Sequence, residues 1–239
     1  MPGLGTIINI LFIIIGGIAG LLFGNRLKER SRETLLLANA VAVLFIGIGG
    51  ALQHMLVVGG NGKLETAGEM MLIASLAIGA LIGEWINLEM RIERFGEWLK
   101  VRTGNSKDAG FVNAFVTASL TVCIGAMAIV GSIEDGASAD HSILFAKAVL
   151  DLIIIMVMSA SLGKGCIFSA IPVGLFQGTV TLLAVLIKPY ITNHAMDNLS
   201  FVGSVLIFCV GVNLFWGKKI RVANLLPALA VAVVWSVFA

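Results

Sequence analysis

The sequence predicts an all-α fold built from transmembrane helices, and three observations point to it. Of the 239 residues, 58% are hydrophobic. Only 13% are charged, whereas a soluble domain carries roughly 25%. Apolar runs of about 18 residues or more, long enough to cross a bilayer, recur along the whole chain. These observations exclude a soluble enzyme and a disordered chain. They leave a polytopic membrane protein, folded as a single membrane domain over residues 1–239.

Eight apolar segments, separated by polar loops, are the predicted spans. Each must satisfy its own backbone hydrogen bonds in lipid, so each is expected to be helical. The predicted spans are residues 4–24, 35–58, 67–87, 110–131, 143–162, 166–187, 199–217 and 222–239.

Residues 88–102 differ from these spans because they are amphipathic. Apolar residues recur there at helical spacing on one face, and charged residues fill the other. With the loop up to residue 108, this segment is a predicted cytoplasmic connector. It either lies on the inner leaflet or extends the third helix into the cytoplasm.

The distribution of basic residues predicts the orientation. Thirteen of the 16 Lys and Arg residues fall in the connections that follow the first, third, fifth and seventh spans. The exceptions are Lys63, Lys147 and Lys188. Because Lys and Arg resist translocation, those connections are expected in the cytoplasm and both termini outside. The alternative is one broken element from 143 to 187, which would move the basic residues after the seventh span to the outside, against the rule.

Two predicted spans carry small residues four positions apart. They are Gly16, Gly20 and Gly24 in the first span and Ser75, Gly79 and Gly83 in the third. Small residues at this spacing let helix backbones approach closely in lipid. We therefore expect tight helix packing, either within one chain or between copies in a homo-oligomer.

Asp151 is the clearest candidate for a functional group inside the membrane. It lies roughly 12 Å into the fifth span at 1.5 Å per residue, and Lys147 precedes it by one helical turn. An ionisable group at this depth is costly unless it faces protein, water or a partner. Asp151 is either one half of an ion pair that holds helices together or a carboxylate that binds a cation or carries a proton.

The chain after Asp151 becomes small and polar around Gly163, and Pro172 interrupts the next span. Gly and Pro breaks in adjoining spans are typical of broken helices whose freed backbone groups bind a solute; ordinary kinks are the alternative. We predict a substrate or ion site between the fourth, fifth and sixth spans. Its candidate residues are Asp151, Lys147, Ser159, Ser161, Ser169, Gln177, Asn113 and Thr117.

Acidic residues gather on the predicted outer side, and Glu134 and Asp135 are the candidates for an acidic vestibule that concentrates cations. The alternative is solvated residues left there by the positive-inside rule. The sequence has no HxxH, HExxH or CxxC spacing for a metal, no P-loop and no nucleophile elbow. We expect no catalytic site, no metal and no cofactor. The expected partners are the lipid bilayer and a small ion or polar solute, and not nucleic acid, because the net charge of +2 is the sum of two unlike faces.

Four strings carry a resemblance to a known family. They are MPGLGTIINI at 1–10, GSIEDG at 131–136, IPVGLFQG at 171–178 and VANLLPAL at 222–229. Over nearly the whole chain, they resemble the YdfK/YqgA-like family of bacterial inner-membrane proteins, a domain of unknown function. The resemblance implies a multi-pass protein of the bacterial plasma membrane and supplies no substrate or activity. It implies that Glu134, Asp135, Gln177 and Asn224 stand in motif segments of the family.

The sequence therefore favours a secondary transporter or channel-like protein for a small ion or polar solute. The alternative is a non-transporting scaffold or regulator that acts through the basic connector 88–108. Transport predicts that Asp151, Ser159, Gln177 and Asn113 converge on one hydrated cavity.

Overall fold

A computed structural model describes residues 1–24, 26, 28–60, 62–123, 126–187 and 192–238. The sequence predicts a single membrane domain, and the helices of the structure group into two compact units. Unit 1 comprises Met1–Ala40 and Arg91–Tyr190, and unit 2 comprises Val41–Met90 and Ile191–Ala239. Each unit is described by itself.

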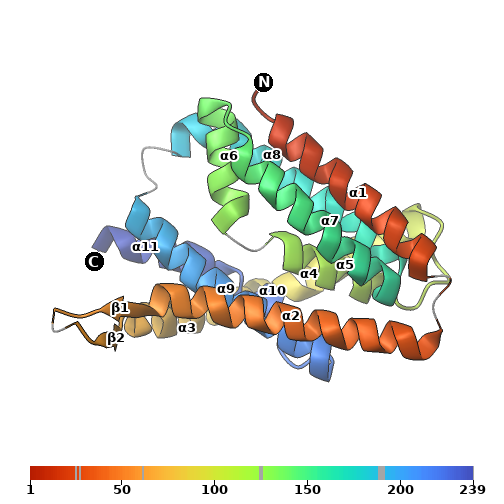
Figure 1. Ribbon diagram of the computed structural model, residues 1–239, viewed down its shortest axis with the longest axis horizontal. Helices are drawn as coiled ribbons and strands as arrows, with labels where there is room; N and C mark the ends of the chain where they lie inside the picture. Colours follow the sequence, from red (N-terminus) through yellow and green to blue (C-terminus); the bar gives the residue numbers. More distant parts are fainter. Residues whose placement is uncertain (25, 27, 61, 124–125, 188–191, 239) are drawn as a thin grey trace. The chain divides into compact units, whose positions relative to one another are not determined.

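Unit 1 is built around two pairs of adjacent helices. Its elements are α1 (Leu4–Gly24), the start of α2 (Glu29–Met55), most of α4 (Leu88–Arg102), α5 (Phe111–Cys123), α6 (Ala126–Ser138), α7 (Ser142–Leu162), the 3-10 helix η1 (Lys164–Ser169) and α8 (Ala170–Ile187). Helix α1 packs along α7, and α6 packs along α8 (Figure 1). The connection η1 packs against α5.

Unit 2 contains the remainder of α2 and a small hairpin. Its other elements are β1 (Leu56–Val58), β2 (Leu64–Thr66), α3 (Glu69–Ile86), α9 (Asn193–Trp216), α10 (Val222–Leu225) and α11 (Pro227–Phe238). The strands pair antiparallel, with Val57 opposite Glu65, and α3 and α9 both pack against α11. The second span was predicted to run to residue 58, which is wrong. The β-branched Val57 and Val58 precede a glycine-rich turn, and this pattern favours a hairpin.

The predicted spans agree broadly with the helices. Among the described residues, six helices are long and apolar enough to cross a membrane, and α5 with α6 makes a seventh if the two form one bent span. Val222–Ser236 is a shorter apolar helix. The connector predicted at 88–102 is helix α4, with the same bounds. Lys188, which the sequence places on the side opposite most basic residues, lies outside the described residues.

One predicted span is wrong in shape. Residues 110–131 were expected to form one helix, but α5 ends at Cys123 and α6 is bent by 63° from it. Helix α6 also continues past the polar string at 131–136 to Ser138. The polar groups of that string find partners within the fold, since Ser132 Oγ donates to the Ala128 carbonyl and Asp135 pairs with His141.

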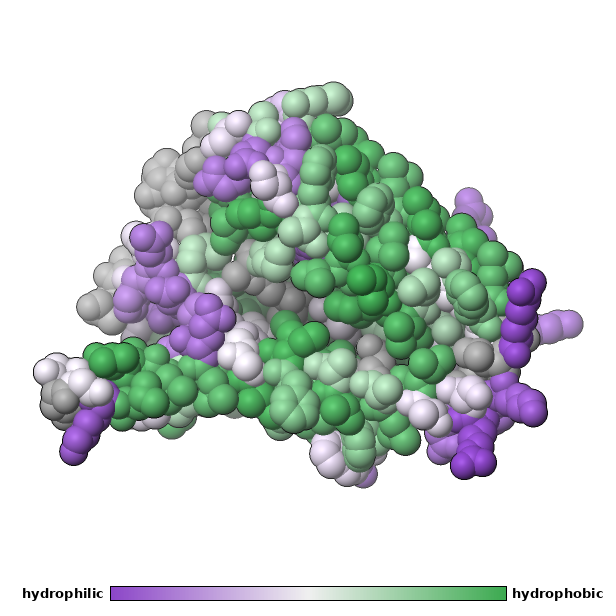
Figure 2. All heavy atoms as spheres, viewed as in Figure 1, coloured by the Kyte–Doolittle hydropathy of each residue, from purple (hydrophilic) through white to green (hydrophobic). Residues whose placement is uncertain are grey.

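Helix α1 presents its large apolar side chains outward and its small ones inward. Its exposed stripe, part of the apolar surface in Figure 2, is Ile7, Leu11, Ile15, Ile18 and Leu22. A soluble helix buries such a stripe, because water makes its exposure unfavourable. This reversed arrangement is the one expected of a helix whose surroundings are lipid.

The inward face of α1 allows very close packing. A Cβ atom on Gly16 or Gly20 would collide with the carbonyl oxygen of Leu152 or Met156 in α7. In unit 2, Gly83 of α3 lies equally close to the backbone of Asn224. The prediction that the small-residue faces mediate tight helix packing is confirmed.

Gly20→Ala should therefore destabilise the protein by about 1–3 kcal/mol, the usual cost of overpacking, because the Met156 carbonyl must move. Gly178→Ala in α8 is the matched control, since a Cβ there meets no atom of the described residues within 4 Å. It should be neutral or stabilising by up to about 1 kcal/mol. Thermal unfolding in detergent measures both, and equal melting temperatures would contradict the close contact.

Candidate functional site

A buried ion pair lies in the middle of α7. Lys147 and Asp151 are 6% and 3% exposed, and the Lys147 ammonium donates to the Asp151 carboxylate. Lys147 Nζ also donates to the carbonyl oxygen of Val122, at 2.8 Å. The pair predicted from the i,i+4 spacing is thus present and shielded.

The break between α5 and α6 supplies the Val122 carbonyl. Val122 lies in the last turn of α5, where helix carbonyls lack the next turn of amides as partners. This end of a helix also carries partial negative charge, which favours an ammonium group. The bent span therefore provides a hydrogen-bond acceptor for Lys147. In a straight helix, the Val122 carbonyl would accept from an amide of the next turn instead.

Two buried amides from other helices complete this centre. Asn9 Nδ2 of α1 donates to Gln177 Oε1 of α8 at 3.3 Å, and the Asn9 amide lies near the Asp151 carboxylate. Within the described chain, Asn9 Oδ1 and Gln177 Nε2 have no hydrogen-bond partner. An unsatisfied buried polar atom costs about 1–3 kcal/mol. One donor and one acceptor thus remain for a small polar guest beside the ion pair.

A second pair of polar side chains lies one turn from the amides. The hydroxyls of Thr6 and Thr181 are 3.5 Å apart, again between α1 and α8. We call the set formed by Thr6, Asn9, Lys147, Asp151, Gln177 and Thr181 the polar cluster; all six residues are buried.

The cluster contains three of the predicted site residues and omits others. Lys147, Asp151 and Gln177 meet, whereas Asn113 is exposed on α5 and Thr117 is half-buried there. Ser169 is buried and donates to the Cys166 carbonyl. The predicted site residues did not include Thr6, Asn9 or Thr181. The signal for Asn9 was its place on the Gly16 and Gly20 face of α1, which packs against α7.

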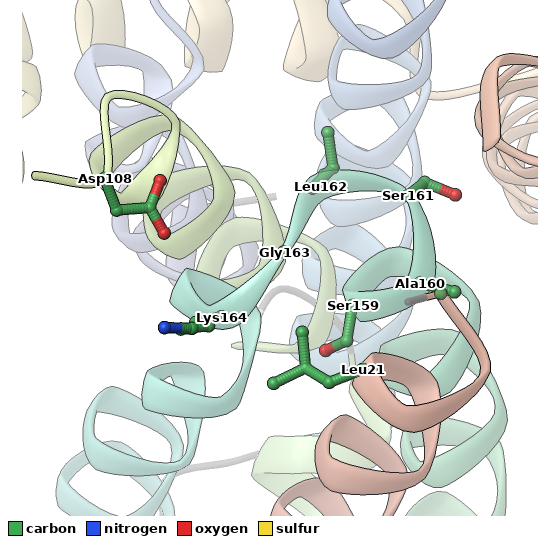
Figure 3. Close-up of a pocket in the computed structure, with 9 residues that line it drawn as sticks. Leu21, Asp108, Ser159, Ala160, Ser161, Leu162, Gly163 and Lys164 are labelled. Atoms are coloured by element: carbon green, nitrogen blue, oxygen red, sulfur yellow. The ribbon is translucent and has the colours of Figure 1, made fainter. Parts of the chain in front are cut away.

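Ser159 and Ser161 belong to a separate pocket at the far end of α7. This cavity of about 260 Å³ is lined by Leu21, Gly24, Asp108 and the run 159–164. Gly163 turns the chain there with a φ of 98°, a conformation that L side chains rarely adopt. Figure 3 shows the Ser161 hydroxyl pointing away from Asp108 and Lys164. The pocket offers a carboxylate, an ammonium group and the Ser159 hydroxyl.

An apolar layer separates the pocket from the polar cluster. Ile13, Ile155 and Met158 are fully buried in one hydrophobic core. Ser159 lies roughly 12 Å along α7 from Asp151, by the helical rise per residue. The expectation that Asp151, Ser159, Gln177 and Asn113 share one cavity is therefore wrong. Asp151 and Ser159 lie on the same helix but on opposite sides of the apolar layer.

The predicted acidic vestibule residues lie in helix α6 and not in an open loop. Asp135 is 0% exposed, and its Oδ1 is 2.5 Å from Nδ1 of His141. Glu134 is half-buried. In the part of the chain that the structure describes, no group of three or more His, Cys, Asp or Glu side chains is placed to hold a metal ion.

Asn224, which the resemblance places in a family motif, joins α4 to α10 within unit 2. Its Oδ1 accepts from the Glu89 amide at 2.7 Å, and Glu89 Oε2 accepts from the Ala223 amide at 3.1 Å. Glu89 also pairs with Lys218 at 2.9 Å. These contacts indicate a structural joint.

Lys147→Met should lower the free energy of unfolding by about 3–5 kcal/mol, because it leaves the Asp151 carboxylate buried without its partner. The double variant Lys147→Met/Asp151→Leu removes both charges and should regain most of that loss. Thermal unfolding in detergent compares the three chains. Equal stability of the single and double variants would contradict an energetically coupled pair.

Comparisons with known proteins confirm the resemblance seen in the sequence. Residues 4–237 match the model of a family described as "Protein of unknown function (DUF554)". The chain is 29% identical over 227 residues to "Uncharacterized membrane protein YdfK" of Bacillus subtilis (strain 168), which covers 95% of this chain and 93% of that protein. It is 31% identical over 233 residues to "Uncharacterized protein YqgA" of Escherichia coli (strain K12), covering 96% and 94%. No solved structure matches. The chain belongs to the DUF554 family of proteins of unknown function.

Proposed function

We propose that this protein is a secondary transporter or channel-like protein for a small ion or polar solute, with its site in unit 1. The polar cluster carries the proposal. An ion pair buried in a membrane-spanning helix is costly, and this one lies beside two amides that each retain an unused polar atom. A broken span that lends its backbone to such a centre is typical of transporters. The site predicted between the fourth, fifth and sixth spans is extended by this proposal to include α1.

We further propose eight spans in a bacterial inner membrane, with both termini outside. The spans are α1, α2, α3, α5 with α6, α7, η1 with α8, α9, and α10 with α11. Two contacts support this topology. The pocket in unit 1 joins the ends of α1, α7 and the loop before α5. In unit 2, Arg221 after α9 pairs with Glu84 near the end of α3, at 2.8 Å. In the proposed topology, the connections after the first, third, fifth and seventh spans all lie on the cytoplasmic side of the membrane. Most of the basic residues lie in these connections.

The alternative function is a scaffold that acts through connector 88–108. Much of the apolar face of α4 is engaged within unit 1, since the ring of Phe95 lies 6.0 Å from that of Phe115 and Gly96 packs on the same residue. This packing accounts for the amphipathic pattern without a partner. It favours the transport proposal.

A ligand screen with a matched variant tests the proposal. The wild-type chain and Lys147→Met/Asp151→Leu are melted in detergent against monovalent ions, divalent ions, pH steps and small polar metabolites. A ligand at a hundredfold excess over Kd stabilises the folded state by about 2.7 kcal/mol. We expect at least one ligand to raise the melting temperature of the wild type alone, and flux of that ligand into liposomes to be lost in the double variant. If every ligand acts alike on both folded chains, the ion pair is only structural and the proposal fails.

A further inference from the structure

A second buried acid lies at the end of unit 1 away from the pocket. Asp135 of α6 is 0% exposed, and the side chain of His141 that pairs with it is 17% exposed. Among the described residues, Asp135 Oδ2 has no hydrogen-bond partner. A Cβ built on Gly5 of α1 would lie 3.3 Å from this oxygen, so Asp135 faces α1 at Gly5, the residue before Thr6 in the chain.

The contacts between α1 and α8 continue from this acid towards the middle of α7. Thr6 pairs with Thr181 at 3.5 Å, and one turn further Asn9 pairs with Gln177 at 3.3 Å. Asn9 then adjoins Asp151. Polar side chains therefore follow one another from the partly exposed His141 to the ion pair, although the surrounding helices are apolar.

The row of polar groups ends at the ion pair. Ile13 lies one turn beyond Asn9 on α1, and Ile155 one turn beyond Asp151 on α7, and both are fully buried in the apolar layer. Polar pairs thus recur about one helical turn apart on one side of Asp151, and an apolar layer closes the other side. This is the arrangement expected of an ion pathway with a single gate.

The chemistry of the route fits a proton better than a metal cation or a solute. Its two ends are carboxylates, one paired with an imidazole and one with an ammonium group, and rows of Asp, Glu and His inside membranes are typical of proton relays. The threonine hydroxyls both donate and accept hydrogen bonds, and the unused atoms of Asn9 and Gln177 suit a bridging water. A metal cation would need several oxygen ligands at one point, whereas these oxygens are spread along two helices.

We propose that unit 1 conducts protons from His141 and Asp135 to Asp151. A proton taken up by the His141 imidazole passes to the Asp135 carboxylate and then, through the hydroxyls and bridging water, to the Asp151 carboxylate. Protonated Asp151 no longer holds the Lys147 ammonium, whose charge is then met by the Val122 carbonyl. When the apolar layer opens, Asp151 gives up the proton to the Asp108 carboxylate in the pocket beyond it, and the ion pair forms again. This inference rests on the proposed function and names its ion.

Among the described residues, two acidic side chains interact with His141. Asp135 contacts it directly, and Asp140, next in the chain, is exposed and interacts with it electrostatically. The nearby groups described on α1 and α8, Gly5 and the two threonines, do not titrate. Asp140 is exposed, and its Oδ1 accepts from the amide and hydroxyl of Ser142 and not from a residue of the polar route. It is therefore a matched control for Asp135.

Proton entry into liposomes tests the proposal. The full chain is reconstituted with a trapped pH dye, and a potassium gradient with valinomycin imposes the membrane potential. We expect the wild type to acidify the lumen faster than protein-free vesicles. Asp135→Asn, His141→Gln and Asp151→Asn should each slow proton entry by roughly tenfold or more, as expected when a group that transfers protons is removed. Asp140→Asn should conduct like the wild type.

The outcomes separate this proposal from the proposed function. Melting temperatures establish that each variant is folded, and His141→Gln, at a partly exposed side chain, provides a second test at the Asp135 end. Two results would overturn the proton route. One is proton entry into wild-type vesicles no faster than into protein-free vesicles. The other is folded Asp135→Asn and His141→Gln variants that conduct protons like the wild type. A ligand that stabilises the wild type and not Lys147→Met/Asp151→Leu would still support transport of that ligand.

Discussion

The buried ion pair of Lys147 and Asp151 is the interaction on which the rest of unit 1 depends. Two charges in the middle of a membrane helix are unfavourable unless attraction, hydrogen bonds and nearby dipoles compensate for lost hydration. Lys147 obtains its second hydrogen bond from Val122, which the break after α5 makes accessible. The Asn9 amide lies near Asp151, because the glycines of α1 bring that helix against the backbone of α7. The broken helix and the glycine stripe therefore serve the same centre.

In both units, a helix with small residues packs against a helix that lies next to a break in the helical chain. In unit 1, α1 lies on α7, which ends at Gly163 and is followed by η1. In unit 2, α3 lies on α10 and α11, with Gly83 against Asn224. The consequences differ. The unpaired atoms of Asn9 and Gln177 lie beside an ion pair that is buried on both sides. In the described part of unit 2, Asn224 Nδ2 is also unpaired, but its neighbour Glu89 pairs with the exposed Lys218 and accepts from the Ala223 amide. This difference is the reason for placing the transport site in unit 1 alone.

Much of the fold follows from local sequence patterns, and the site follows only in part. Apolar run lengths predict α1, α3 and α7 closely, and the i,i+4 spacing predicts the Lys147 and Asp151 pair. Such patterns assign a residue to a face of its own helix but do not identify the helix that covers this face. For that reason the meeting of Asn9 with Gln177 was not predicted, and Asn113 was included in error.

The remaining differences arise where polarity is satisfied inside the fold. The string at 131–136 resembles a loop because it is polar, yet Asp135 is buried through its contact with His141. A polar residue in a sequence needs a hydrogen-bond partner, but the sequence does not show whether that partner is water or another part of the protein. The same limit explains why the polar cluster and the pocket at Gly163 were expected to be one cavity, since the apolar residues between them carry no signal beyond ordinary hydrophobicity.

Cysteine accessibility in the membrane tests most directly whether a polar route reaches the ion pair and stops at the apolar layer. In a chain whose native Cys123, Cys166 and Cys209 are replaced by Ala, single cysteines are introduced as Thr6→Cys, Asn9→Cys and Ile13→Cys. A small, water-soluble thiol reagent is added from the side on which Asp135 lies. We expect it to modify the cysteines at positions 6 and 9 and to spare the one at position 13. Modification of Asn9→Cys no faster than that of Ile13→Cys would contradict a route to Asp151.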